Sequence, residues 1–339
     1  MNAGQRQSGL DIVRSFAILF VLSVHFFLNT YFYSTPIIGK NMYFETFFRM
    51  FFMICVPLFL VLTGYLQTNK MPTKSYYKKL LPILMVYIIY SILSLLYFHF
   101  ILNDDRSLKE YIYSIFNFSA DGYSWYINMY IGLFLLSPYL NILYKNIPTK
   151  KQKILLISSL LFVTSFPDFF NRYIGGQLFF SANYWIPMYP ITYYFLGSFI
   201  KEYQIKINKF KGALLLIVLC IVGTIIEIFA AKGNVFSGSA GYFGSLIIAF
   251  QTVVFFLVFY DINIKSKLLT TLFALISVLS LDIYLASFIS DKIVYSYFLS
   301  KYPGYMQQEL FYFAPIVVLS TFLLAFIMSY LRHKLIRIR

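Results

Sequence analysis

Long apolar runs recur along the whole chain, and they constrain its fold more than any other feature. Each run has about 20 residues, which is the length that a helix needs to cross about 30 Å of hydrocarbon. The runs are continuous and not alternating, so a transmembrane β-barrel is disfavoured. The sequence predicts an all-α, polytopic bundle of about ten transmembrane helices. The predicted spans are residues 10–33, 42–66, 80–101, 125–144, 154–170, 184–203, 212–231, 240–260, 277–298 and 310–331.

The charge composition fits a membrane protein. Only 12% of the 339 residues are charged, whereas a soluble domain usually has about 25%. The net charge of +15 does not require a nucleic-acid partner, because the positive-inside rule explains where the basic residues lie. With the N-terminus in the cytoplasm, both termini are cytoplasmic. All but eight of the 28 basic residues then face the cytoplasm; the eight are Lys40, Arg49, Arg106, Lys109, Arg172, Lys232, Lys292 and Lys301.

No stretch is polar enough to form a soluble domain of its own. We therefore expect residues 1–339 to form a single integral membrane domain in contact with lipid. The longest polar connection, residues 103–124, falls outside by the charge rule, and its middle is apolar enough to lie along the membrane interface. Cys55 and Cys220 lie within predicted spans, which favours buried thiols over a disulfide.

The first span carries an arginine and a histidine, Arg14 and His25, with ten residues between them. Eleven helical steps of about 100° make roughly three turns, so both side chains leave one face, about 16 Å apart along the axis. From a start at Leu10, Arg14 lies about 6 Å into the span and His25 about 22 Å. Ionisable groups inside a membrane usually face the bundle interior or a water-filled cavity.

These two side chains suggest chemistry, although each has a simpler explanation. A neutral imidazole near a hydroxyl can act as a general base, but His25 can also make a packing hydrogen bond. Arg14 can anchor the helix end by reaching the cytoplasm. Asp11, one turn before Arg14, can pair with it or simply favour the positive end of the helix dipole. The shared face of Arg14 and His25 favours a functional role.

Five segments, taken in order, resemble the membrane acyltransferase-3 family. Residues 9–14 read Gly-Leu-Asp-x-x-Arg and open the Arg-(ten residues)-His spacing. The other four are Val-Pro-Leu-Phe-Leu-Val-Leu-Thr-Gly-Tyr-Leu at 56–66, Tyr-Lys-Lys-Leu-Leu-Pro at 77–82, Trp-Tyr-Ile-Asn-Met-Tyr-Ile-Gly-Leu at 125–133 and Ser-Leu-Asp-Ile-Tyr-Leu at 280–285. In one departure, Ser287 stands where many family members carry a histidine.

The resemblance implies a reaction and a site. The family moves an acyl group, commonly acetyl, from acyl-CoA to a sugar hydroxyl of a cell-surface polysaccharide or its lipid-linked precursor, in the plasma membrane. His25 would be the catalytic residue, and Arg14 would support the acyl-CoA site. Lys78 and Lys79 match a basic cluster that would hold donor phosphates, although they can equally be topology signals. The resemblance implies no metal and no permanently bound cofactor.

Further residues are expected to support the site. Trp125 and Tyr284 stand within two of the matching segments. Asp282 would be a hydrogen-bond partner in a cavity or a solvated acid near the cytoplasmic end of its span. Glu227 would orient His25, bind the hydroxyls of the acceptor sugar or lie at the membrane interface. Two further intramembrane charges, Glu45 and its neighbour one turn on, Arg49, can neutralise each other.

Two functions from other classes remain open at this stage. A membrane transporter exporting a glycan or a small solute would also need kinked helices and intramembrane charges. Against it, we find no inverted repeat. A structural or sensory protein would explain the bundle but not the spacing of Arg14 and His25. We therefore predict an O-acyltransferase, with direct transfer and a transient acyl-enzyme both open.

Overall fold

The computed structural model describes residues 7–174, 184–336 and 338, and every regular element within these residues is helical. Eight segments of the described chain are long and apolar enough to cross a membrane. The prediction of an all-α, multi-pass membrane protein is thus confirmed. The segments are Ser8–Asn29, Gly39–Gln67, Lys74–Ile101, Trp125–Lys145, Lys150–Asn171, Lys209–Ala231, Lys267–Lys301 and Ala314–Leu335.

The other two predicted spans contain shorter helices. Residues 184–203 hold α10 (Tyr189–Tyr203, 15 residues), preceded by the 3-10 turn η2 (Ile186–Met188). Pro187 lies in the first turn of η2 and Pro190 in the first turn of α10, so neither interrupts the helix. Proline lacks the N–H that a helix interior needs, and it is well tolerated in a first turn, where that N–H has no partner.

The second short helix is α12 (Leu246–Phe259), with 14 residues. It lies in the predicted span 240–260, whose first residues belong to a loop and not to the helix. Gly241 and Gly244 lie in this loop, where the cost of ordering glycine disfavours a helix. The helix therefore begins only after Ser245, its N-cap residue.

The chain forms two compact units, each assembled from separate stretches. The first unit comprises residues 1–68, 143–277 and 304–315, and the second comprises residues 69–142, 278–303 and 316–339. The prediction of a single domain over residues 1–339 stays a prediction.

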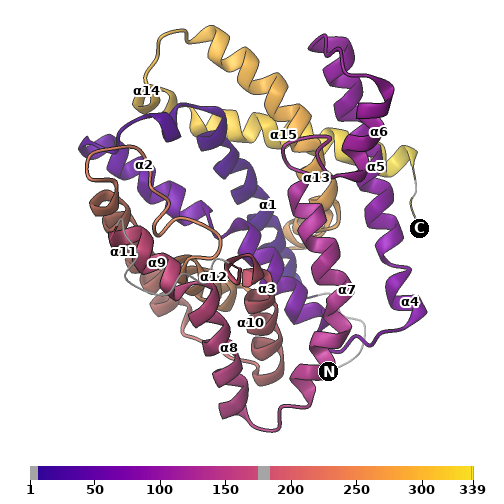
Figure 1. Cartoon of the computed structure of the whole chain (residues 1–339), viewed down its shortest axis with the longest axis vertical. Coiled ribbons are helices and arrows are strands. Elements are labelled where there is room, and N and C mark those ends of the chain that lie inside the picture. The colour runs from indigo at the N-terminus through magenta and orange to yellow at the C-terminus, as the bar shows by residue number, and fades with distance from the viewer. Residues whose placement is uncertain (1–6, 175–183, 337, 339) are drawn as a thin grey trace. The chain divides into compact units, whose positions relative to one another are not determined.

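The first unit is built around α1 (Ser8–Asn29) and α3 (Cys55–Gln67), which pack against each other and, in turn, against α2, α10 and α12 (Figure 1). Its remaining elements are η1 (Phe32–Ser34), α2 (Gly39–Phe52), α8 (Lys150–Thr164), α9 (Phe166–Ile174), α11 (Lys209–Ala231), the start of α13 (Lys267–Lys301) and α14 (Gln307–Phe311). Cys55 and Cys220 are both buried thiols, as predicted.

Two glycines allow α3 and α10 to approach closely. A Cβ atom on Gly64 would overlap the backbone carbonyl of Tyr194, and one on Gly197 would overlap the backbone carbonyl of Val61. Helices in a membrane gain little from the hydrophobic effect, so close packing through small residues holds them together. The glycine of the Thr-Gly-Tyr-Leu segment therefore has a packing role.

A proline divides α2 from α3. The predicted span 42–66 is interrupted at Met53 and Ile54, and Pro57 lies four residues after Met53. Because proline donates no hydrogen bond to the carbonyl four residues earlier, the helical ladder fails at this point. The first regular bond of the new helix runs from Leu58 N to Ile54 O, at 2.9 Å.

The second unit contains the loop that the charge rule places outside. Its elements are α4 (Lys74–Tyr77), α5 (Leu80–Ile101), α6 (Leu108–Phe116), most of α7 (Trp125–Lys145), the larger part of α13 and nearly all of α15 (Ala314–Leu335). A capping box formed by Ser107 and Glu110 starts α6. Its apolar side chains Leu108, Tyr113 and Phe116 are 73%, 67% and 80% exposed. Such a helix fits the predicted position along the membrane interface.

Candidate functional site

A single unbroken helix, α1, carries both Arg14 and His25. The eleven-residue step therefore places their side chains on one face, about 16 Å apart along the axis. The helix ends at Asn29 and not at Tyr33, because Asn29 Nδ2 and Thr30 Oγ1 bond back to the carbonyls of His25 (2.9 Å) and Phe26 (2.8 Å). Arg14 and His25 consequently lie near opposite ends of the helix.

Two side-chain hydrogen bonds connect the start of α1 to the start of α13. Arg14 is half-buried, and its Nη1 atom donates a hydrogen bond to Ser277 Oγ at 3.1 Å. Ser15 Oγ donates to Phe273 O at 3.2 Å. Asp11, one turn earlier, is buried. The hydrogen bonds of Arg14 and Ser15 hold the start of α1 against the start of α13.

His25 is only 5% exposed. Between it and Arg14, the helix lies among phenylalanine rings. Phe16 contacts Phe255 at 5.9 Å between ring centroids, and Phe20 contacts Phe51 and Phe255 at 5.1 and 5.5 Å. Such apolar surroundings strengthen the electrostatic interactions of any polar group within them.

The two predicted donor-binding lysines lie in the second unit. Lys78 is the C-cap residue of α4, and Lys79 is the N-cap residue of α5. Both are exposed. Exposed lysines beside the positive end of a helix dipole favour an anion, which agrees with either a phosphate-binding or a topological role.

Asp282 forms a buried ion pair. Its Oδ1 atom accepts from Arg332 Nε at 2.6 Å, and its Oδ2 atom lies 2.5 Å from Arg332 Nη2. The side chains are 6% and 8% exposed, so Asp282 is not a solvated acid. Its two-point pairing joins α13 to the last turn of α15 and compensates its charge within the second unit.

Tyr284 supports the loop that precedes α7. Its hydroxyl donates to Tyr123 O at 2.6 Å, while the hydroxyl of Tyr123 donates to Asp291 Oδ2 at 2.8 Å. Trp125, which begins α7, follows this loop directly. Two of the predicted supporting residues thus meet at one loop of the second unit.

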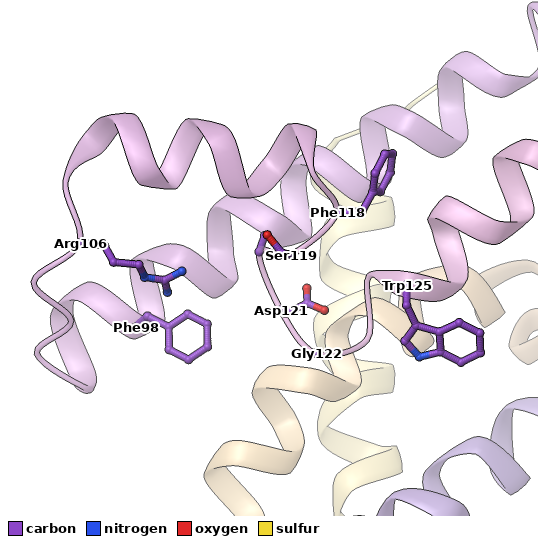
Figure 2. Close-up of a pocket in the computed structure, with 8 residues that line it drawn as sticks. Phe98, Arg106, Phe118, Ser119, Asp121, Gly122 and Trp125 are labelled. Atoms are coloured by element: carbon purple, nitrogen blue, oxygen red, sulfur yellow. The ribbon is translucent and has the colours of Figure 1, made fainter.

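The same loop borders a pocket of about 440 Å³. Figure 2 shows Phe98 and Arg106 on one side, Trp125 on the other and the carboxylate of Asp121 between them. The lining also includes Phe118, Ser119, Ala120 and Gly122. Small-molecule sites commonly measure about 300–1,000 Å³ and combine apolar walls with a few polar groups, as this pocket does.

Glu227 anchors a loop. Its Oε1 atom accepts from the N–H groups of Ala240 (2.5 Å) and Gly241 (2.8 Å), and its Oε2 atom accepts from Ser237 Oγ (2.8 Å) and Gly238 N (3.1 Å). The side chain is 0% exposed. Four donors use the carboxylate fully, which favours a structural role over contact with an acceptor sugar.

Glu45 and Arg49 do not pair as expected. Glu45 Oε2 accepts from Gln307 Nε2 at 2.8 Å, and Arg49 Nε donates to the hydroxyl of Tyr33 at 2.6 Å. The guanidinium of Arg49 also lies 5.0 Å from the ring centre of Phe236. Spacing along one helix shows that two charges can meet, but partners from other elements decide the outcome here.

Sequence reasoning did not single out the polar groups of the pocket. In the sequence, Arg106 and Asp121 are simply charges of the polar connection at residues 103–124. A signal was present in the density of aromatic and charged residues between Phe98 and Trp125. Only the folded loop shows that these side chains surround one cavity.

Comparisons with known proteins agree with the resemblance seen in the sequence. No curated protein and no solved structure matches the chain. A family model described as an acyltransferase domain, that of the acyltransferase-3 family, matches residues 7–330. This match spans nearly the whole chain and both units. The chain therefore belongs to the acyltransferase-3 family and is a membrane acyltransferase.

Proposed function

We propose that this acyltransferase moves an acyl group, most simply acetyl, from acyl-CoA to a sugar hydroxyl of a cell-surface polysaccharide or its lipid-linked precursor, in the plasma membrane. One observation carries the proposal. The unbroken helix α1 holds a buried imidazole and a half-buried guanidinium on one face, near its opposite ends. Membership of an acyltransferase family favours group transfer over the export of a glycan.

In the proposed reaction, His25 acts as a general base. One ring nitrogen takes the proton of the sugar hydroxyl as its oxygen attacks the thioester carbonyl carbon. The new C–O bond forms, the C–S bond breaks, and the thiolate of CoA takes up a proton from the imidazolium. A buried position suits this step, because water would otherwise compete with the sugar for the acyl group.

The donor would be held by cations. Arg14, on the helix of His25, is the proposed partner of a CoA phosphate, because a guanidinium can bind phosphate oxygens at two points. Lys78 and Lys79 add two exposed positive charges on the side that the charge rule assigns to the cytoplasm. Lysine binds phosphate as a point charge and lacks the two-point grip of arginine. We therefore expect Arg14→Ala to raise the KM for acyl-CoA more than Lys78→Ala or Lys79→Ala does.

The test is a transferase assay with the purified full-length protein in nanodiscs. Radiolabelled acetyl-CoA and glycan from a strain lacking this protein are mixed, and free CoA and labelled glycan are measured. We expect His25→Ala to lower kcat by at least a hundredfold, in line with the loss of a general base. His333→Ala, an exposed histidine on α15, is the matched control and should leave kcat unchanged.

Two results would overturn the proposal. If His25→Ala keeps full activity, the histidine is not the base. If wild-type protein releases no CoA with any glycan, while a deletion strain loses the surface glycan itself, the chain acts in export.

A further inference from the structure

We infer that the pocket between α5 and α7 binds one sugar ring of the acceptor glycan. This inference rests on the proposed function, which names a glycan as acceptor but assigns no site to it. Three observations support it: the chemistry of the residues that line the pocket, a buried oxygen of Asp121 without a hydrogen-bond partner among the described residues, and the contacts that hold the loop before α7 in place.

The lining suits a neutral, polyhydroxylated ring. Trp125 is 40% exposed and borders the cavity together with Phe98 and Phe118. The C–H groups of a sugar ring pack against an aromatic face, while its hydroxyls need donors and acceptors at the edge. Arg106 and Asp121 supply donors and acceptors from the same pocket.

Asp121 has an oxygen available for a ligand. Its side chain is 7% exposed, and its Oδ1 atom accepts from Tyr123 N at 2.8 Å. Its Oδ2 atom is buried and has no partner at hydrogen-bond distance and angle among the described residues, although Ser124 lies close enough to lower the pKa of the carboxyl. A buried polar atom without a partner is costly and unusual. A hydroxyl donated by a bound sugar would satisfy it.

The charges of the pocket disfavour ionic ligands. Arg106 is already paired with Asp104, with Nη2 and Oδ2 at 2.5 Å. Asp104 and Asp121 together therefore outweigh one guanidinium, which disfavours a phosphate or carboxylate. The guanidinium lies 5.3 Å from the ring centre of Phe98, where it occupies that ring and repels a second cation such as choline. The pocket therefore favours a neutral ligand over an anion or a cation.

The loop is held in place by hydrogen bonds within the second unit. Tyr284 holds the carbonyl of Tyr123, and Tyr87 on α5 donates to Ile115 O at 2.7 Å. Phe118 adopts a φ of 53°, a left-handed conformation that costs free energy for a residue with a Cβ and often marks binding sites. Such preorganisation lowers the entropic cost of binding.

The position of the pocket fits an acceptor at the membrane surface. It follows α6, whose apolar side chains are exposed, in the loop that the charge rule places outside. A glycan linked to a lipid and a free glycan end would present the same sugar chemistry here. We name that shared chemistry as the ligand and let the experiment separate the two sources.

Tryptophan fluorescence can test the pocket directly, because the chain has only two tryptophans, Trp125 and Trp185. In the Trp185→Phe background, Trp125 is the sole reporter. The protein is placed in vesicles of phosphatidylethanolamine and phosphatidylglycerol, because the scaffold proteins of nanodiscs carry tryptophans of their own. Maltoside detergent is left out, because its sugar head would compete. Methyl glycosides of glucose, galactose, N-acetylglucosamine and rhamnose are titrated, then the same sugars on lipid anchors. Choline and inorganic phosphate are titrated separately.

We expect at least one sugar, free or lipid-anchored, to change the fluorescence saturably. Stronger binding of the anchored form would identify the lipid-linked source, and equal binding a free glycan end. Asp121→Asn should weaken binding about tenfold or more, because it removes a charged acceptor but keeps the shape of the side chain. Asp105→Asn, an exposed carboxylate of the same loop, is the matched control and should bind as the parent does.

The inference fails if no sugar changes the fluorescence, if Asp121→Asn binds as the parent does, or if choline or phosphate binds instead. The measurement needs no acyl donor, so it does not depend on catalysis. Sugar binding that persists in His25→Ala, together with transfer that also persists there, would reject the role of His25 and keep the pocket.

Discussion

Replacing Glu227 by alanine tests whether this buried acid holds the loop before α12 or binds an acceptor. The change removes the acceptor of three backbone N–H groups and one hydroxyl. Each buried N–H left without a partner costs about 1–3 kcal/mol, so three of them cost about 3–9 kcal/mol if the loop stays in place. This is comparable to the whole stability of many proteins, about 5–15 kcal/mol. We therefore expect the loop to open instead.

Trypsin can detect that opening, because the exposed Lys232 lies at the start of the loop. Wild-type protein in nanodiscs should resist cleavage after Lys232, and Glu227→Ala should be cut there at least tenfold faster. Glu227→Gln keeps one acceptor oxygen and should be intermediate. Ser237→Ala removes one donor to the carboxylate and the acceptor of Ser239 N, but leaves the three backbone N–H bonds to Glu227, so it should be cut more slowly than Glu227→Ala.

One outcome refutes this reasoning. If Glu227→Ala resists trypsin and melts as the wild type does, the carboxylate does not hold the loop. A loss of glycan binding in such an intact variant would then restore the prediction that Glu227 contacts the acceptor.

Three further predictions concern packing, the buried ion pair and pH. Gly64→Ala should lower the thermal stability by at least the 1–3 kcal/mol typical of overpacking, whereas Gly132→Ala, which has open space around it, should be neutral or stabilising in melting experiments. Asp282→Ala leaves Arg332 buried and uncompensated and should cost about 3–5 kcal/mol; the double variant with Arg332→Ala should cost less than the sum of the single changes in a double-mutant cycle. Burial raises the pKa of Asp121, so its contribution to stability is greatest below the unfolded value of about 3.9 and is lost as the pH rises through the folded pKa. Asp121→Asn should remove this dependence when melting is followed between pH 3 and 7.

The sequence was sufficient for the fold class because hydrophobic length is a local property. The run around Arg14 and His25 predicts a helix whatever its neighbours are, and the structure places both on one unbroken helix. Span 184–203 was less predictable. The length and hydropathy of the run suggested a full span, but Pro187 and Pro190 move the start of α10 to Tyr189.

The sequence does not predict which side chains of different elements bond to each other. Glu45 and Arg49 are suitably spaced for pairing, yet Gln307 and Tyr33 bind them instead. Gln307 follows Glu45 by 262 positions, and no local pattern reports such a contact. The same limit applies to Glu227, whose donors lie in a loop 10 to 14 positions further along the chain.

These cases separate two uses of a buried charge. An intramembrane acid is a reasonable functional candidate by default, but full use of its oxygens by neighbouring groups is the mark of a structural role. Glu227 accepts four hydrogen bonds, and both oxygens of Asp282 contact the guanidinium of Arg332. Asp121 differs, because one oxygen is buried without a partner among the described residues and the side chain borders a cavity. A carboxylate kept in that state costs stability, and a ligand that donates a hydrogen bond is the simplest reason for its retention.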